Sequence, residues 1–269
     1  DSSWTMPPIR KKFELYAAIR PAKSYSDSKN IDIIFVRELT EGLQSTDTIV
    51  GGYPEFRPNE EITIASRVIT RKGSNRVAKA AFDIAVSKNR SKVTAAHKEP
   101  LFRLSCGMFL EECVKVSKEY PSISYEDALI DTTAMHLVSN PESFDVVVTT
   151  NQFGDILSDI GAGLIGSIGM APGLCLGDNI AMAQATHGSA PDIAGKNIAN
   201  PYAMIMSTSM LLSWMGSKYN EEKLIVASNI IEESTLEVIK ERKYLTADIG
   251  GKSSTIDMTN AIIEKVKTR

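Results

Sequence analysis

Apolar runs of strand length alternate with helical patterns along most of this chain, and that alternation restricts the folds it can adopt. IDIIFV (31–36) and FDVVVTT (144–150) are continuous apolar runs, which predict strands buried on both faces. SKVTAAHK (91–98) predicts a shorter strand. Apolar residues at a 3.6-residue spacing predict helices in the second part of 62–88, near 105–119 and from 151 onward. Strands that alternate with helices predict an α/β fold with a substantial parallel sheet.

Two further segments have patterns of their own. Residues 125–140 predict a helix that begins with a capping box from Ser124 to Asp127. Residues 43–66 are turn-rich and β-like, without helical periodicity. This second pattern favours a projecting arm over an element of the core.

Composition excludes several classes of protein. The 269 residues, 43% of them apolar, can bury one substantial core or two modest ones without disulfides. A formal net charge of -3 makes nucleic acid and anionic membranes unexpected partners. Three cysteines fit neither a disulfide framework nor a zinc site, and no apolar run reaches the roughly 18 residues of a membrane span. We expect a soluble protein of the cytoplasm or an organelle matrix, and the opening residues, which lack a start methionine, suggest that an upstream part is missing.

Two carboxylates, Asp155 and Asp159, follow the apolar run FDVVVTT directly. Their spacing of four residues points both side chains the same way on a helix. Hard divalent cations such as Mg²⁺ or Mn²⁺ bind oxygen ligands of this kind, whereas a solvated helix face is the alternative explanation of the same spacing. Because α/β sheets place their ligand sites where strands end, the position favours a metal site.

Two glycine-containing segments suggest different functions. GAGLIG (161–166) matches a dinucleotide fingerprint, but a helix precedes it where that fingerprint requires a strand, so we reject this interpretation. THGSAPDIAGKNIANP (186–201) has no periodicity and predicts a loop that approaches a ligand closely. In this loop Asp192 could accept hydrogen bonds from a ribose diol and would repel a 2′-phosphate.

Three arginines, Arg10, Arg20 and Arg37, stand among otherwise apolar residues. Arginines at the ends of buried segments often clamp a carboxylate with two hydrogen bonds. A structural ion pair explains each of them equally well when it is taken singly.

Four segments resemble the signatures of the β-decarboxylating dehydrogenases, the family of isocitrate, 3-isopropylmalate, homoisocitrate, D-malate and tartrate dehydrogenases. They are ELYAAIRPAK, VRELTEG, TTNQFGDILSDIGAGLIGS and HGSAPDIAGKNIANP. The resemblance covers nearly the whole chain, and the last two segments are the most specific. It implies a two-domain isocitrate/isopropylmalate dehydrogenase-like fold, not a Rossmann fold, with a mixed, largely parallel sheet, helices on both faces and a β-rich dimer arm.

The resemblance also implies roles for individual residues. A Mg²⁺ or Mn²⁺ ion would be held by Asp155 and Asp159 of one subunit and by Asp131 of its partner. The family's catalytic lysine, also lent by the partner, falls on Lys98, with Asp131 as its companion in catalysis. The three arginines would bind the substrate carboxylates. NAD would be bound by a loop that includes His187, Gly188, Ser189, Ala190, Asp192, Ile193 and Asn200.

The implied activity is the oxidation and decarboxylation of a (2R)-2-hydroxy acid of the isopropylmalate, isocitrate or malate type, with hydride transfer to NAD. Because Lys98 and Asp131 would act across an interface, the resemblance implies a homodimer or higher oligomer with shared active sites. Residues 16–165 would form the smaller domain, and 1–15 with 166–269 the remainder of the larger, nucleotide-binding domain. The segment before Arg10, with Ser3, Trp4, Met6 and Pro7, favours 3-isopropylmalate or D-malate over isocitrate.

Two positions depart from the family pattern. The proton-donating tyrosine is replaced by Gln44, whose amide cannot protonate an enolate, although Tyr53 further along the arm offers a phenol. The asparagine usually found two residues after the lysine is Pro100. These departures favour an alternative, a non-catalytic regulatory subunit of such a dehydrogenase, whereas the complete set of arginines, lysine and aspartates favours the enzyme.

Overall fold

The computed structural model describes residues 6–25, 30–44 and 54–269, and the described chain divides into two compact units. The first contains the chain up to Ile19 together with Asp32–Ile160 and Cys175–Ile180. The second contains Arg20–Ile31, Gly161–Leu174 and Ala181–Arg269. The domain boundaries expected from the family resemblance stay a prediction.

In the described part of the chain, seven strands form one sheet in the order β6-β5-β7-β2-β1-β8-β9. β2, β7, β5 and β6 run parallel, as the alternation of strands and helices predicts. The residues of β7 are buried on both faces of the sheet, which explains its continuous apolar sequence. The strands are β1 Ala17–Lys23, β2 Asp32–Glu38, β5 Lys92–His97, β6 Ser124–Leu129, β7 Val146–Thr149, β8 Leu174–Leu176 and β9 Ala181–Ala183.

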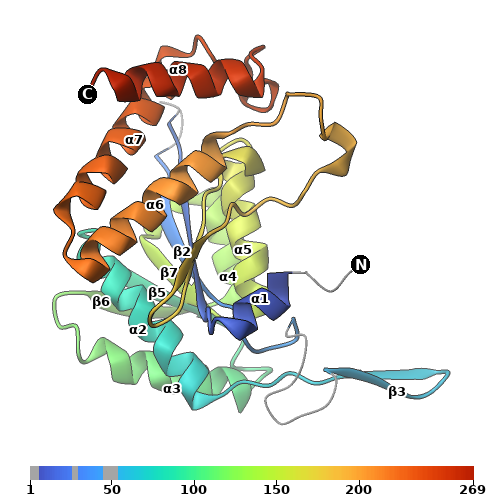
Figure 1. Ribbon diagram of the computed structural model, residues 1–269. Helices are drawn as coiled ribbons and strands as arrows, with labels where there is room; N and C mark the ends of the chain where they lie inside the picture. The colour runs from blue at the N-terminus through green and yellow to red at the C-terminus, as the bar shows by residue number, and fades with distance from the viewer. Residues whose placement is uncertain (1–5, 26–29, 45–53) are drawn as a thin grey trace. The chain divides into compact units, whose positions relative to one another are not determined.

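Helices cover both faces of the parallel strands (Figure 1). The connections from β2 through α2 to β5, and from β5 through α3 to β6, move in one direction across the sheet, whereas the connection through α4 to β7 moves back. Because such crossovers are right-handed, α2 and α3 lie on one face and α4 on the other. The helices of this part of the chain are α1 Met6–Lys12, α2 Arg71–Ser87, α3 Ser105–Ser117, α4 Ile130–Ser139 and α5 Asn151–Leu164.

The predicted helix over 125–140 is wrong in its first half. Residues Ser124–Leu129 form β6, which pairs with β5 in parallel register over its whole length, and α4 begins only at Ile130. The capping box is absent, since the N-cap is Leu129 without a side-chain hydrogen bond. Glu, Ala and Leu in this segment favour a helix locally, but pairing with β5 satisfies the backbone groups on one side of this edge strand.

Residues 54–66 contain an exposed hairpin of β3 Glu55–Asn59 and β4 Ile62–Ala65. Its antiparallel pairing agrees with the β-like pattern expected there, while residues 45–53, Tyr53 among them, lie outside the described part. A role of this hairpin as a dimer arm stays a prediction.

The second unit is built on α6 Tyr202–Tyr219, α7 Glu222–Glu241 and α8 Thr255–Lys267. α8 begins with a capping box formed by Ser254 and Asp257. The apolar core of this unit contains Met170, Tyr202, Met206, Val238, Ile239, Leu245, Met258 and Ile262.

Short 3₁₀ turns occur in both units. In the first unit such a turn lies at Pro141–Ser143, and in the second unit such turns lie at Ile168–Met170, Pro191–Ile193 and Ala247–Ile249.

Two expectations from composition can be compared with the structure. Cys106, Cys113 and Cys175 are all buried. Within the described ranges, each helix is too short or too polar to cross a lipid bilayer.

Candidate active site

The carboxyl ends of four parallel strands meet at one edge of the sheet in the first unit. The register aligns Arg37 of β2 with Thr149 of β7, Thr149 with Ala96 of β5, and His97 with Leu129 of β6. The segments that follow β5, β6 and β7 contain Lys98, Asp131 and Asp155, which the sequence predicts to bind metal or to take part in catalysis. β2 is followed by a helix on one face and β6 by a helix on the other, so the chain reverses its winding here, and open α/β sheets bind ligands at such a point.

Arg37 is the centre of the polar contacts at this edge. Its side chain is buried, with 5% of its surface exposed. Nε and Nη2 both donate to Oδ1 of Asn151, at 3.0 and 2.7 Å, and Nη2 also donates to Oε1 of Gln44 at 2.9 Å. Nη1 forms an ion pair with Asp155. A Cβ on Gly154 would lie 2.6 Å from Cβ of Arg37, so only glycine lets α5 pack this closely on the arginine.

Asp155 and Asp159 lie on α5, one helical turn apart, as the spacing predicts. Asp155 accepts hydrogen bonds from Arg37 and from Nε2 of Gln44, the latter at 3.2 Å, and Asp159 is exposed. Asp155 therefore already holds a cationic group in this structure. Among the described residues, no three His, Cys, Asp or Glu side chains gather closely enough to hold a metal ion. Carboxylate oxygens are the ligands that Mg²⁺ and Mn²⁺ prefer, so the chemistry of Asp155 and Asp159 fits such an ion.

Lys98 and Asp131 form an ion pair with each other in the same chain. Lys98 directly follows β5, and Asp131 lies in the first turn of α4. The hydrogen bond from Lys98 lowers the pKa of Asp131. The side chain of Asp131 is 63% exposed and that of Lys98 is 23% exposed, so both are accessible to a ligand.

Arg67 supports the turn that follows Lys98, a contact that the sequence did not indicate. Its guanidinium lies over the rings of Phe102, at 4.7 Å, and Phe153, at 5.2 Å. It also donates to the hydroxyl of Thr150 at 3.3 Å. The backbone N–H of Phe102 donates to the carbonyl of Lys98, so Arg67 links this turn to the start of α5. Pro100 lies within the turn, where no strand or helix needs its missing N–H.

The other two predicted arginines lie in different units. Arg10 lies in α1 of the first unit and is half-buried. Arg20 lies in β1, is buried, and belongs to the second unit. Of the residues predicted to select the substrate, Ser3 and Trp4 lie outside the described part, and the side chains of Met6 and Pro7 are likewise not described.

The predicted nucleotide loop borders an open cavity of about 810 Å³ in the second unit. Six of the seven predicted cofactor-binding residues line it, namely His187, Gly188, Ser189, Ala190, Ile193 and Asn200. Asp192 does not, since it lies exposed in the short 3₁₀ turn at Pro191–Ile193. The first residues of α8, Thr255 and Ile256, also line the cavity and place a positive helix end beside it.

Asp248 holds this loop and escaped the sequence-based prediction. It accepts hydrogen bonds from the hydroxyl of Ser167 at 2.6 Å and from Nδ2 of Asn200 at 3.0 Å. Its distance of nearly 50 residues from the loop explains why no local pattern indicated it. By contrast, Glu38, Glu41 and Asn151 lie inside the quoted motifs VRELTEG and TTNQFGDILSDIGAGLIGS, so their position was a usable signal.

Comparisons with known proteins agree over nearly the whole chain. The family model described as isocitrate/isopropylmalate dehydrogenase matches residues 2–266. A homoisocitrate dehydrogenase of Methanocaldococcus jannaschii is 42% identical, over 97% of this chain and 74% of its own length. A regulatory subunit of an NAD isocitrate dehydrogenase of Dictyostelium discoideum is 40% identical, over 96% of this chain and 70% of its own length. The crystal structure of isocitrate dehydrogenase from Methylococcus capsulatus matches with a TM-score of 0.87 and 38% identity, covering 99% of this chain and 78% of that one.

Proposed function

Because this chain belongs to the isocitrate/isopropylmalate dehydrogenase family, we propose that it oxidises and decarboxylates a small (2R)-2-hydroxy acid of the isopropylmalate, isocitrate or malate type, with NAD as hydride acceptor. The family and the α/β fold class expected from the sequence are confirmed. The observation that carries the proposal is the polar row at the sheet edge, where Arg37 lies against Asp155 and Lys98 lies against Asp131.

Arg37 provides the best-defined contact for a substrate carboxylate. Its fork of N–H donors is buried and its orientation is fixed by Asn151, so little conformational entropy is lost when a carboxylate binds. Arg10 and Arg20 are proposed as the other two clamps on the evidence of the motif resemblance alone. A carboxylate that binds Arg37 also relieves the attraction between Arg37 and Asp155, which leaves Asp155 able to bind a metal ion.

Asp155 and Asp159, with Asp131 of a partner subunit, would hold Mg²⁺ or Mn²⁺. A divalent ion bound there supplies a Lewis acid that stabilises negative charge on the substrate oxygen during oxidation and loss of CO₂. Lys98 is proposed to handle the proton of the substrate hydroxyl, and Asp131 keeps its ammonium group in place through the ion pair. Gln44 lies in the same group of contacts and orients Arg37 and Asp155, since it accepts from the one and donates to the other.

The cavity beside α8 is the proposed site of NAD, which supplies a hydride acceptor when bound. Glycine and small side chains such as Gly188, Ser189 and Ala190 leave room for close backbone approach, and the amino-terminal end of α8 attracts an anionic group. Asp192 is proposed to accept hydrogen bonds from the adenosine ribose and to repel a 2′-phosphate. This role requires Asp192 to turn toward the cavity, because it does not line it here.

A homodimer with shared active sites completes the proposal. The chain exposes large apolar side chains on α4, where Met135 is 57% and Val138 66% exposed, and on the hairpin, where Phe56 is 52% exposed. Apolar surface of this kind is typical of subunit interfaces. Asp131 lies in α4 and forms an ion pair with Lys98, so both side chains could reach the active site of a partner bound on α4. We propose the cytoplasm or an organelle matrix as the compartment.

The alternative function, a non-catalytic regulatory subunit, is favoured by Gln44 at the position of the family's tyrosine and by the similarity to a protein named as a regulatory subunit. A turnover assay of the complete purified protein with Mg²⁺ and NAD, tested on isocitrate, homoisocitrate, 3-isopropylmalate and D-malate, separates the two. Turnover of one of these acids supports the enzyme. Binding of such an acid or of NAD without turnover supports the regulatory subunit.

A further inference from the structure

Asn151 occupies a position between Arg37 and the turn that follows β2. Its carbonyl oxygen accepts two hydrogen bonds from Arg37, and its amide nitrogen donates to the backbone carbonyl of Glu41 at 2.9 Å. Arginine has only donors and a carbonyl is only an acceptor, so this is the one amide orientation that satisfies both neighbours. Asn151 is itself 98% buried, with a relative exposure of 2%.

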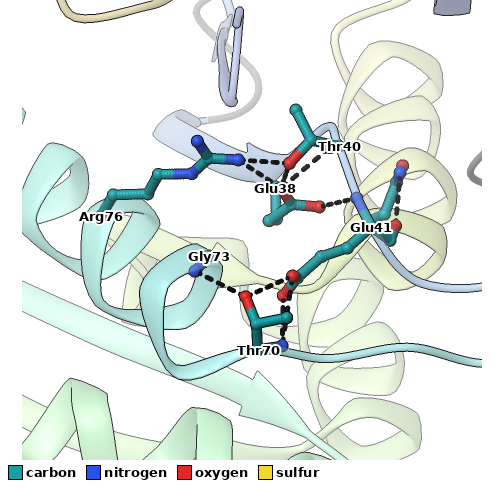
Figure 2. A network of polar contacts seen from close by, with 7 residues as sticks. Glu38, Thr40, Glu41, Thr70, Gly73 and Arg76 are labelled. Atoms are coloured by element: carbon teal, nitrogen blue, oxygen red, sulfur yellow. Dashed lines mark hydrogen bonds and ion pairs between the residues drawn. The ribbon is translucent and has the colours of Figure 1, made fainter. Parts of the chain in front are cut away.

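Two buried carboxylates, Glu38 and Glu41, stabilise the turn at 38–41 (Figure 2). Glu38 accepts hydrogen bonds from the backbone N–H groups of Thr40, at 2.8 Å, and Glu41, at 2.9 Å. Arg76 of α2 lies 3.8 Å from Glu38 and donates to the hydroxyl of Thr40. These contacts fix the direction of the Glu41 carbonyl that Asn151 needs.

The side chain of Glu41 attaches this turn to the start of α2. It accepts from the backbone N–H of Thr70 at 3.1 Å and from its hydroxyl at 2.8 Å, and that hydroxyl caps the helix by accepting from the N–H of Gly73 at 3.0 Å. A Cβ on Gly73 would lie 2.5 Å from Cδ of Glu41, so the carboxylate rests directly on the first helical turn. The amino-terminal N–H groups of a helix stabilise a carboxylate placed in this way.

From these contacts we propose that Asn151 and Glu41 are positioning residues that orient the guanidinium of Arg37 for the substrate carboxylate, with α2 as their support. This inference rests on the proposed function only for the identity of the ligand that Arg37 binds. The chain of contacts runs from Thr70 through Glu41 and Asn151 to Arg37. Asn151 binds Nε and Nη2 on one edge of the guanidinium. Nη1, which is paired with Asp155 in this structure, can then exchange that partner for a ligand.

The test compares the complete wild-type protein with Asn151→Ala, Glu41→Ala and Glu41→Gln. Asn151→Ala and Glu41→Ala should raise KM for the hydroxy acid roughly 10- to 100-fold, the factor expected when hydrogen bonds to a charged group are lost, with KM for NAD unchanged. Glu41→Gln keeps an oxygen that can accept from Thr70, so its KM should stay within about twofold of wild type. Asn75→Ala is the matched control, because Asn75 also lies on α2 but donates its amide to Glu112 of α3 and takes no part in the contacts that join Thr70, Glu41, Asn151 and Arg37.

A second measurement does not depend on turnover. The Nε–H of Arg37 is held by Asn151, so its NMR signal, identified by its loss in Arg37→Lys, should exchange slowly with water in the wild type and Glu41→Gln and rapidly in Asn151→Ala and Glu41→Ala. An unchanged KM and unchanged exchange in Asn151→Ala would overturn the proposal, and so would equal behaviour of Glu41→Gln and Glu41→Ala. If the wild type turns over no hydroxy acid, the proposed function fails, and the exchange of this signal alone decides on the two positioning residues.

Discussion

Replacing Glu41 by glutamine should change how the stability of this protein depends on pH. Glu41 is buried, with 2% of its surface exposed, and burial together with the charge of Glu38 raises the pKa of its carboxyl to about 7 from 4.5, while hydrogen bonds from Thr70 and the charge of Arg76 oppose the rise. A carboxyl whose pKa is raised in the folded state contributes stability that is present in full below the unfolded value. That contribution is lost as the pH rises through about 7.

The magnitude follows from the same two values. Each pH unit between the unfolded and folded pKa corresponds to about 1.4 kcal/mol, so the free energy of unfolding should fall by about 3 kcal/mol between pH 4.5 and pH 7 through this carboxyl. Glu41→Gln cannot ionise and lacks this loss. The pKa of Glu38 is raised mainly by burial as well, but Glu38 is present in both proteins and contributes to both curves.

Urea unfolding at pH 5, 6, 7 and 8, at one protein concentration, measures the effect. The free energy of unfolding of Glu41→Gln minus that of wild type should rise by about 2.5 kcal/mol across this range, most of it below pH 7.5, since part of the total change is complete at pH 5. Glu142→Gln, a change at an exposed position of the same charge type, should show no such trend. A difference between Glu41→Gln and wild type that stays constant with pH would refute the reasoning.

Three further outcomes test the proposed function. Asp155→Asn and Asp159→Asn should each weaken Mn²⁺ binding, measured by calorimetry, and lower turnover by orders of magnitude, because each removes a charged oxygen ligand; unchanged affinity in both would exclude this metal site. Wild type should use NAD and reject NADP, whereas Asp192→Ser should accept NADP in a coupled absorbance assay; equal use of both by wild type contradicts the role of Asp192. Lys98→Ala and Arg20→Ala should each be nearly inactive alone. Subunit exchange between them should restore roughly one quarter of wild-type activity, since half the dimers are mixed and each mixed dimer has one intact site. No recovery despite exchange, checked with differently tagged chains, would mean that Lys98 serves its own subunit.

The class of fold could be predicted from the sequence, and so could the positions of several residues of the candidate site on their helices, strands and loops. Continuous apolar runs at 31–36 and 144–150 became the central parallel strands β2 and β7, because a strand covered on both faces can tolerate few polar residues. The helical spacing of Asp155 and Asp159 placed both on α5, since this geometry is local. The glycine-rich loop at 186–201 was predicted from residue types alone and borders the cavity beside α8.

Which side chains contact one another could not be predicted from local sequence patterns. Residues 124–129 include the helix formers Glu126, Ala128 and Leu129, yet they form a strand because β5 pairs with them in parallel register over all six residues. Asn151 and Glu41 are 110 residues apart, so no periodicity could indicate that one amide joins Arg37 to the start of α2. Asp192 was predicted to bind the cofactor because it lies in this loop. In the structure it lies in the 3₁₀ turn at Pro191–Ile193 and does not line the cavity. Local patterns report which face of an element is buried, whereas hydrogen bonds and ion pairs depend on which element packs against that face.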